Sequence, residues 1–245
     1  GANETNWDIY IPAGNEVPNT SSTPTTSVTT NSYAVTGLNN STNYTMYVRA
    51  NCGVGDYSFW IPVSFRTPQI PAQLPYTQNW EDGTENAQWT ILNGTATNQW
   101  YIGGAVNNGG DSSLYISSDN GATNSYDISS SSDVWVYRDI YFDPTFGEYG
   151  LSFDYRADAE SCCDYLKVFV GPCVEPSGNN TPAGATQLGG TLNGQATWTN
   201  ASFSLTSAMA GVQRLYILWH NDGSVGTAPP GAIDNISVVG FNCGH

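Results

Sequence analysis

Apolar and polar positions alternate along most of this chain, and helical periodicity is almost absent. In residues 149–155 the odd positions are apolar or aromatic and the even positions are glycine, serine and aspartate. Alternation with a period of two, bounded by Gly, Asn, Asp or Pro, predicts β-strands. The denser apolar runs 166–170 and 214–219 are typical of central strands in a sandwich. The pattern therefore predicts an all-β protein, in which residues 204–211 are a weak helix candidate that a loop explains equally well.

Prolines interrupt this pattern between positions 68 and 75. Three of the eight residues there are proline, and because proline cannot donate a backbone hydrogen bond we expect no regular strand pairing in that stretch. We therefore assign a short module to residues 1–67, a linker to 68–75 and a larger module to 76–240. Residues 241–245 are interpreted as the start of a linker to a further domain of the same polypeptide.

The short module carries the spacing of a tyrosine corner. Leu38 precedes by six residues Tyr44, which opens an alternating strand, and the phenol of such a tyrosine bonds back across the connection between two strands. With the runs at 7–11 and 64–67, the module resembles a fibronectin type III domain, which implies a partial, Ig-like sandwich. The first strands of that family are missing before Trp7. We interpret the module as a fragment of a larger multidomain protein; the alternative is an incomplete domain that obtains its missing strands from a partner.

The larger module resembles the jelly-roll domains of the cleaved adhesin family, which includes the adhesin domains of gingipain proteases, and more loosely the MAM domains. The matching segments are residues 75–83, 109–117, 150–155, 164–170 and 232–238. The resemblance implies a jelly-roll β-sandwich of two facing antiparallel sheets that binds calcium and serves adhesion or glycan contact. One loop departs from the family, because residues 92–98 contain no acidic side chain, which argues against a calcium site on that loop.

One acidic residue in the closing strand points to a metal ion. Asp234 lies within the apolar run 232–238, and burying an unpaired carboxylate is expensive. The whole chain has six Lys and Arg residues, so a metal cation is the expected partner of this side chain.

We predict a calcium site that joins the first and last strands of the larger module. Its ligands are Glu81, Asp111 and Asp234, with Asp82 and Asn235 as neighbours that could contribute. Asp111 follows a Gly-Gly turn able to present backbone carbonyls, and calcium takes about six to eight oxygen ligands in irregular geometry. The alternative for each acid taken singly is an exposed carboxylate at a strand end.

Charge and composition exclude several classes of partner. The formal net charge is −15 at pH 7 with a single lysine, Lys167, so the basic surface that nucleic acids or anionic lipids require is absent. Only 11% of the residues are charged but 13% are aromatic, which favours packed cores over disorder. No apolar stretch approaches the roughly 20 residues of a membrane helix, so we expect no membrane insertion. No signal peptide is recognisable: either it has been removed, or the chain is a piece of a longer protein.

Five cysteines, two of them adjacent, favour an oxidising compartment and hence a secreted protein or one on a bacterial cell surface. An extended strand between Cys163 and Cys173 would place its ends about 25–30 Å apart, whereas a disulfide requires Cα atoms within about 7 Å. Two disulfide pairings therefore stay open: a bond between Cys162 and Cys163, and pairing across loops. Partners for Cys52 and Cys243 are expected before and beyond this segment.

Residues suited to catalysis are few. The histidines are His220 and His245, no Gly-x-Ser-x-Gly motif is present, and no spacing singles out two carboxylates for glycoside hydrolysis. We therefore predict no enzymatic activity. Aromatic rings next to polar loops could stack on sugars, and the candidates are Trp100, Tyr101, Trp135, Tyr137, Trp198 and Trp219. Most aromatic residues of a sandwich are expected in its core, so no sugar site is assigned.

These inferences combine into one prediction. The chain is a non-catalytic adhesion or ligand-binding region of a large secreted bacterial surface protein, stabilised by calcium, with a glycan or protein on a surface as its ligand. Two alternatives are a carbohydrate-binding accessory region of a secreted hydrolase or protease, and a structural spacer or filament subunit.

Overall fold

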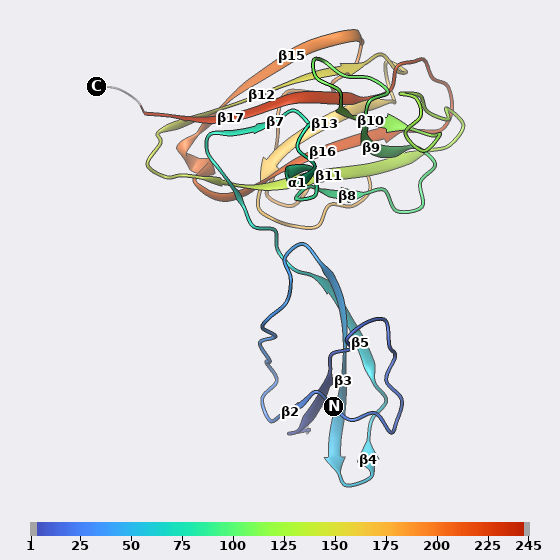
Figure 1. Ribbon diagram of the computed structural model, residues 1–245, viewed down its shortest axis with the longest axis vertical. Coiled ribbons are helices and arrows are strands. Elements are labelled where there is room, and N and C mark those ends of the chain that lie inside the picture. The colour runs from blue at the N-terminus through green and yellow to red at the C-terminus, as the bar shows by residue number, and fades with distance from the viewer. Residues whose placement is uncertain (1–3, 243–245) are drawn as a thin grey trace. The chain divides into compact units, whose positions relative to one another are not determined.

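The computed structural model describes residues 4–242 of the 245-residue chain. It consists almost entirely of β-strands (Figure 1), which confirms the predicted all-β class. The backbone divides into two compact units, residues 1–69 and 70–245, and each is described by itself. No helix among the described residues is long and apolar enough to cross a membrane. Cys243, His245 and most of the predicted C-terminal linker lie outside the described residues.

The N-terminal unit is a single antiparallel sheet. Its strands are β1 (Trp7–Tyr10), β2 (Thr26–Val28), β3 (Asn43–Gly53), β4 (Asp56–Tyr57) and β5 (Ile61–Arg66). They pair in the order β2-β1-β3-β4, and β5 also pairs with β3. A single layer is compatible with the partial sandwich predicted from the sequence, and the assignment to a fibronectin type III domain stays a prediction.

The two faces of this sheet differ in character. The register places Ile9 opposite Val48 and Val48 opposite Ile61, so an apolar row crosses three neighbouring strands on one face. On the other face, Asp8 lies opposite Arg49. The Nε of Arg49 donates to Oδ2 of Asp8 at 2.9 Å, and both side chains are buried.

The tyrosine corner forms as predicted. Tyr44 is the second residue of β3, and its Oη accepts a hydrogen bond from the backbone N–H of Asn39 at 2.9 Å. This bond fixes the connection that leads into the strand. Residues 33–38, which precede it, form no strand.

The proline-rich segment takes part in the larger unit, contrary to the prediction. Strand β6 (Ala72–Gln73) pairs in parallel with β11 (Ser132–Phe142) through Ile140 and the residue after it. The prediction was wrong for these two residues because Pro71 and Pro75 flank the pair rather than occupy it, and a short edge strand needs few backbone donors.

The larger unit is a sandwich of two six-stranded sheets (Figure 1). The first, here called the β12 sheet, contains β7 (Tyr76–Gln78), β9 (Gln99–Gly103), β10 (Ser113–Ser117), β12 (Glu148–Ala157), β15 (Gln195–Thr206) and β17 (Ala232–Phe241). The second, the β16 sheet, contains β6, β8 (Thr90–Leu92), β11, β13 (Tyr165–Gly171), β14 (Thr186–Gln187) and β16 (Gly211–Asn221). The three strands predicted from alternation and apolar density are β12, β13 and β16. The expected jelly-roll β-sandwich is therefore present.

Alternation along the strands builds the core. In β12 the side chains of Tyr149, Leu151, Phe153 and Tyr155 are buried, while the residues between them are more exposed. They belong to one apolar cluster with residues of the β16 sheet such as Ile217. Burying each large side chain contributes about 1.5–3 kcal/mol, so the inward rows hold the sheets together. The outward rows of the β12 sheet are left for polar chemistry.

Two short helical turns complete the unit. Helix α1 (Gly83–Asn86), which the sequence pattern did not predict, begins after Asp82. The carboxylate of Asp82 caps it by accepting from the N–H of Thr84 at 2.8 Å, as aspartate commonly does at this position. The 3₁₀ turn η1 (Ser207–Met209) lies inside the weak helix candidate.

Candidate metal centre

Three carboxylates from distant parts of the chain converge on the loop 104–112, which connects β9 and β10. Asp234 accepts a hydrogen bond from the backbone of Asn108, and Asp154 accepts one from the same residue's side chain. Glu81 accepts two hydrogen bonds from the backbone further along this loop. We call these three residues the acidic centre.

Asp234 is the most deeply buried member of the acidic centre. It lies in β17 with a fully buried side chain. Its Oδ2 accepts from the N–H of Asn108 and its Oδ1 from the N–H of Asn235, both at 2.8 Å. Loss of water raises the pKa of Asp234, and the charges of Asp154 and Glu81 raise it further. Asp234 is therefore held by neutral donors only, beside two further acids.

Asp154, which the sequence analysis did not single out, lies opposite Asp234 on β12. Its Oδ2 accepts from the side-chain amides of Asn108 and Asn235 at 2.8 and 2.9 Å. Its Oδ1 accepts from the amide of Asn200 at 2.9 Å. Desolvation alone would raise the pKa of Asp154, but these three amide donors lower it below its ordinary value. The ionised form is thus held in place by its neighbours.

A backbone turn aims Glu81 at the same loop. Trp80 has φ of 65°, a conformation that non-glycine residues adopt rarely. The Oε1 of Glu81 accepts from the N–H groups of Asp111 and Ser112, both at 2.8 Å. A Cβ on Gly110, where φ is +74°, would lie 2.4 Å from this oxygen. The glycine thus leaves the space that the carboxylate occupies.

The remaining predicted ligands have different positions. Asn235, at φ of 52°, donates to Oδ2 of Asp154 and to the carbonyl of Asn108, both at 2.9 Å. Asp111 contributes its backbone N–H to the cluster, while its side chain is exposed and forms no hydrogen bond with the other described residues of the cluster. Asp82 caps helix α1 instead. The structure therefore gathers Glu81, Asp234 and Asn235, adds Asp154, and directs Asp82 elsewhere.

The acidic centre offers oxygen ligands of the kind that calcium prefers, although the oxygens of its three acids do not all lie within 4.8 Å of one another. Within residues 4–242, no Lys, Arg or His forms an ion pair with Glu81, Asp154 or Asp234. Carboxylate oxygens are the ligands that calcium prefers, and backbone carbonyls and water complete its shell. Burial is the main cause of the raised pKa of Asp234, and a divalent cation would offset both this loss of water and the repulsion from Asp154 and Glu81. The fit rests on a buried acid without a cationic partner.

A second acidic group lies in the loops that follow β12 and β16. One oxygen each from Glu160, Asp164 and Asp222 lie within 4.8 Å of one another. Tyr126 donates to Oδ2 of the buried Asp164 at 2.5 Å. Desolvation and the two neighbouring charges raise the pKa of Glu160. Asp222 is exposed, and exposed acids commonly cluster without an ion, so no metal is assigned here.

Most of the aromatic residues considered for sugar stacking are in the interior. Trp100, Trp135, Tyr137 and Trp219 are at most 2% exposed, which confirms the expectation that sandwich aromatics serve the core. Tyr101 and Trp198 are partly exposed.

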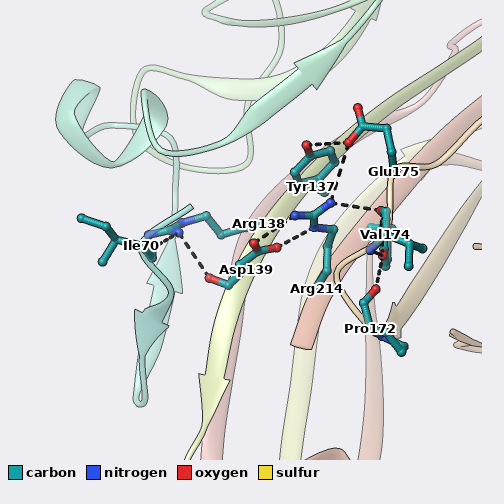
Figure 2. Close-up of polar contacts among 9 residues, drawn as sticks. Ile70, Tyr137, Arg138, Asp139, Pro172, Val174, Glu175 and Arg214 are labelled. Atoms are coloured by element: carbon teal, nitrogen blue, oxygen red, sulfur yellow. Dashed lines mark hydrogen bonds and ion pairs between the residues drawn. The ribbon is translucent and has the colours of Figure 1, made fainter. Parts of the chain in front are cut away.

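The chain itself covers the outer aromatic face of the β16 sheet. Figure 2 shows the segment after β13 lying against Tyr137 and Arg214. The hydroxyl of Tyr137 donates to Glu175 at 3.1 Å, and Arg214 donates to the carbonyl of Val174 at 3.0 Å. Arg214 also pairs with the buried Asp139 at 2.6 Å. The ring of Tyr137 is consequently covered by the chain rather than exposed to a ligand.

His220 is engaged with an acid and a ring. Its Nδ1 lies 2.7 Å from Oδ1 of Asp133, and its ring centroid lies 5.0 Å from that of Tyr165. None of its hydrogen bonds in the described part of the chain reaches a serine, threonine or cysteine. The arrangement provides no nucleophile with an adjacent base.

Cys162 and Cys163 are bonded to each other, one of the two pairings that the sequence left open. Cys52 and Cys173 are free. Burial raises the pKa of the Cys173 thiol to about 11, and the charge of Asp139 adds to the effect. Such a thiol is a weak nucleophile at neutral pH.

No family model matches the sequence, and no curated protein matches it. The chain is similar to the CBM22-1 xylan-binding domain of Paenibacillus barcinonensis Xyn10C, with 14% identity, a TM-score of 0.45, and coverage of 71% of this chain and 99% of that one. It is also similar to the K1 cleaved adhesin domain of Lys-gingipain from Porphyromonas gingivalis W83, with 13% identity, a TM-score of 0.44, and coverage of 68% and 98%. A third is TmCBM61 in complex with beta-1,4-galactotriose, with 11% identity, a TM-score of 0.42, and coverage of 67% and 99%. Likenesses this distant assign neither a ligand nor an ion to this chain.

Proposed function

We propose that this chain is a non-catalytic adhesion or ligand-binding region of a large secreted bacterial surface protein, and that calcium at the acidic centre stabilises its larger unit. The observation that carries the proposal is the convergence of Glu81, Asp154 and Asp234 on one loop without a cationic side chain. Glu81 follows β7 and Asp234 lies in β17, two strands that pair with each other. A bound ion would tie the opening of the unit to its closing strand.

Three further features support this function. The disulfide between Cys162 and Cys163 suits an oxidising compartment outside the cytoplasm. The net charge of −15 disfavours nucleic acid and anionic membranes as partners, which leaves glycans and proteins. His220 is occupied by Asp133, which supports a binding role without chemistry.

The calcium part of the proposal is tested by thermal unfolding with calcium and with a chelator. Ligand present at about a hundredfold excess over its Kd adds about 2.7 kcal/mol of stability, which for a unit of this size shifts the melting midpoint by roughly 5–10 °C. We expect this shift in the unaltered chain. An identical midpoint after complete removal of metal would contradict the proposal.

Two matched variants identify the ligands. Glu81→Gln keeps the oxygen that accepts from Asp111 and Ser112 but removes the charge, so we expect the calcium-dependent shift to fall to less than half. Asp82→Asn neutralises the adjacent acid and keeps the helix cap, because asparagine caps as well as aspartate. We expect Asp82→Asn to retain the full shift. Equal losses in both variants would show that the charge of this segment, rather than Glu81 itself, is what calcium senses.

The binding part of the proposal is tested on arrays of glycans and of surface proteins with the calcium-loaded chain. Saturable binding to one class identifies the ligand. Absence of binding to both classes would favour a purely structural spacer instead.

A further inference from the structure

Hydroxyl side chains form a row across the outer face of the β12 sheet. The register pairs Thr77 with Ser237, Ser237 with Ser152 and Ser152 with Ser202. Directly paired residues of antiparallel strands point to the same face, and neighbouring strands lie about 4.8 Å apart. Four adjacent strands, β7, β17, β12 and β15 (Figure 1), therefore present hydroxyls at regular intervals. We call these four residues the hydroxyl row.

A surface groove of ≈ 320 Å³ lies along this row. Ser152, Ser202 and Ser237 of the row line it, together with Ser204. Ser202 donates to Asn200 at 2.7 Å. Within the described part of the chain, the hydroxyls of the other three serines have no hydrogen bond to protein groups. They are available to a ligand.

An aromatic ring borders one side of the groove. Phe241, the last residue of β17, is 52% exposed. Its ring lies against Gly150, where a Cβ would come within 2.9 Å of the Phe241 ring carbon Cε2. Because glycine leaves this space open, the ring stays beside the serines with a free apolar face. A single exposed ring is common on protein surfaces, and Phe241 matters here because it lies beside the row of hydroxyls.

The acidic centre lies next to the row on the other side. Asp154 is two residues from Ser152 along β12, and its partner Asn200 is two residues from Ser202 along β15. No ionisable side chain lines the groove itself. The carboxylates of the acidic centre and the overall charge of −15 would repel an anionic ligand but not a neutral one.

We propose that this groove binds a neutral oligosaccharide, an inference that rests on the proposed binding function and names its ligand surface. Each serine offers one donor and two acceptor lone pairs, which is the pattern that sugar hydroxyls complement. Phe241 supplies an apolar face for the C–H side of a sugar ring. The strand spacing of about 4.8 Å is comparable to the length of one pyranose unit, so successive units can meet successive strands.

The test uses the full chain with calcium. Neutral and anionic oligosaccharides are screened on an array, and the best neutral one is measured by isothermal titration calorimetry. Ser152→Ala combined with Ser237→Ala removes two hydroxyls from the floor, and Phe241→Ala removes the ring. We expect the double variant to bind about tenfold more weakly, since each hydrogen bond contributes about 0.5–1.5 kcal/mol. We expect a several-fold loss for Phe241→Ala.

Matched controls lie outside the groove. Thr206→Ala removes an exposed hydroxyl at the end of β15 that caps nothing. Phe59→Ala removes a ring that is 84% exposed in the N-terminal unit. Both controls should bind within about twofold of the unaltered chain, and thermal melts should show all variants folded.

The outcomes separate this inference from the proposed function. If a saccharide binds and the groove variants bind as well as the controls, or if only anionic saccharides bind, the groove assignment is overturned while a binding function stands. If the chain binds no saccharide but a surface protein, the ligand class named here is wrong. If it binds neither, the proposed function fails and the groove assignment with it.

Discussion

Two buried aspartates, one in each unit, have pKa values that their surroundings shift in opposite directions. Asp8 is 1% exposed and accepts from Arg49 at 2.9 Å. Its desolvation would raise its pKa, but the bonds from Ser27, Asn51 and Arg49 lower it. Asp234 is 0% exposed, receives backbone N–H bonds only, and has a raised pKa. The first aspartate has a guanidinium partner within the chain, whereas the second is held by neutral backbone donors only.

The comparison shows how a lack of basic residues is used. With six Lys and Arg residues in 245, guanidinium partners go to Asp8 and Asp139. A buried carboxylate that has no such partner must be stabilised by neutral donors, as Asp154 is, or take up a proton or bind a metal ion. Three acids without a cationic partner among residues 4–242 contact the loop 104–112, and this is where the proposed ion would contribute to the fold.

The largest expected effect comes from breaking the complete pair. Arg49→Met leaves Asp8 buried without its counter-charge, and removing one partner of a buried ion pair costs about 3–5 kcal/mol. Hydrogen exchange of β1 and β3 amides in the full chain measures this loss. Asp8→Asn in the Arg49→Met background should recover part of it. A loss below about 1 kcal/mol would mean that neutral donors alone hold Asp8, against the usual cost of a broken buried pair.

A smaller effect is expected from crowding Glu81. Gly110→Ala places a methyl group against the carboxylate and also strains a left-handed backbone, at about 1–2 kcal/mol. Gly109→Ala imposes comparable strain at φ +96° but meets no atom within 4 Å. We expect both variants to unfold at a lower temperature than the unaltered chain. Only Gly110→Ala should lose the calcium-dependent shift of the melting midpoint. A calcium-dependent shift of the melting midpoint that persists in Gly110→Ala would contradict the assignment of Glu81 as a ligand.

The smallest effect is a titration of opposite sign at the two aspartates. The lowered pKa of Asp8 adds stability that is present above its unfolded value of 3.8 and is lost as the pH falls through the folded pKa. The raised pKa of metal-free Asp234 adds stability that is present below 3.8 and is lost as the pH rises through the folded pKa. Carboxyl ¹³C titration by NMR resolves both. Calcium should bring the apparent pKa of Asp234 below that of the metal-free chain, and an unchanged value would argue against coordination by this residue.

Alternation and apolar density predicted β12, β13 and β16, and alternation works for β12 because one-sided burial imposes a period of two. The run 149–155 became β12 with its odd residues inside. Asp154 was missed for the same reason: it occupies an ordinary outward position of that strand. Its role depends on pairing with Asp234 across a register shift between Ser152 and Asp154, and such a shift leaves no local signal in the sequence.

Residues next to each other in sequence were separated by local geometry. Glu81 and Asp82 are neighbours, yet the turn at Trp80 sends Glu81 to the loop 104–112 while Asp82 begins a helix of four residues. A helix that short has no periodicity to detect. The hydroxyl row was equally hidden, since its four members come from four separated strands and align only through the register.

The pairing of β7 with β17 determines how this unit would respond to tension. The chain enters β7 at Tyr76, which lies opposite Val238, and it leaves β17 three residues later at Phe241. Pulling on both ends would thus separate β7 from β17 one residue pair at a time, through Thr77 and then Gln78, after the two pairs between β6 and β11 have opened. Glu81 and Asp234 lie beyond these pairs. An ion bound between them would therefore bear mechanical load only after the pairs between β7 and β17 have separated.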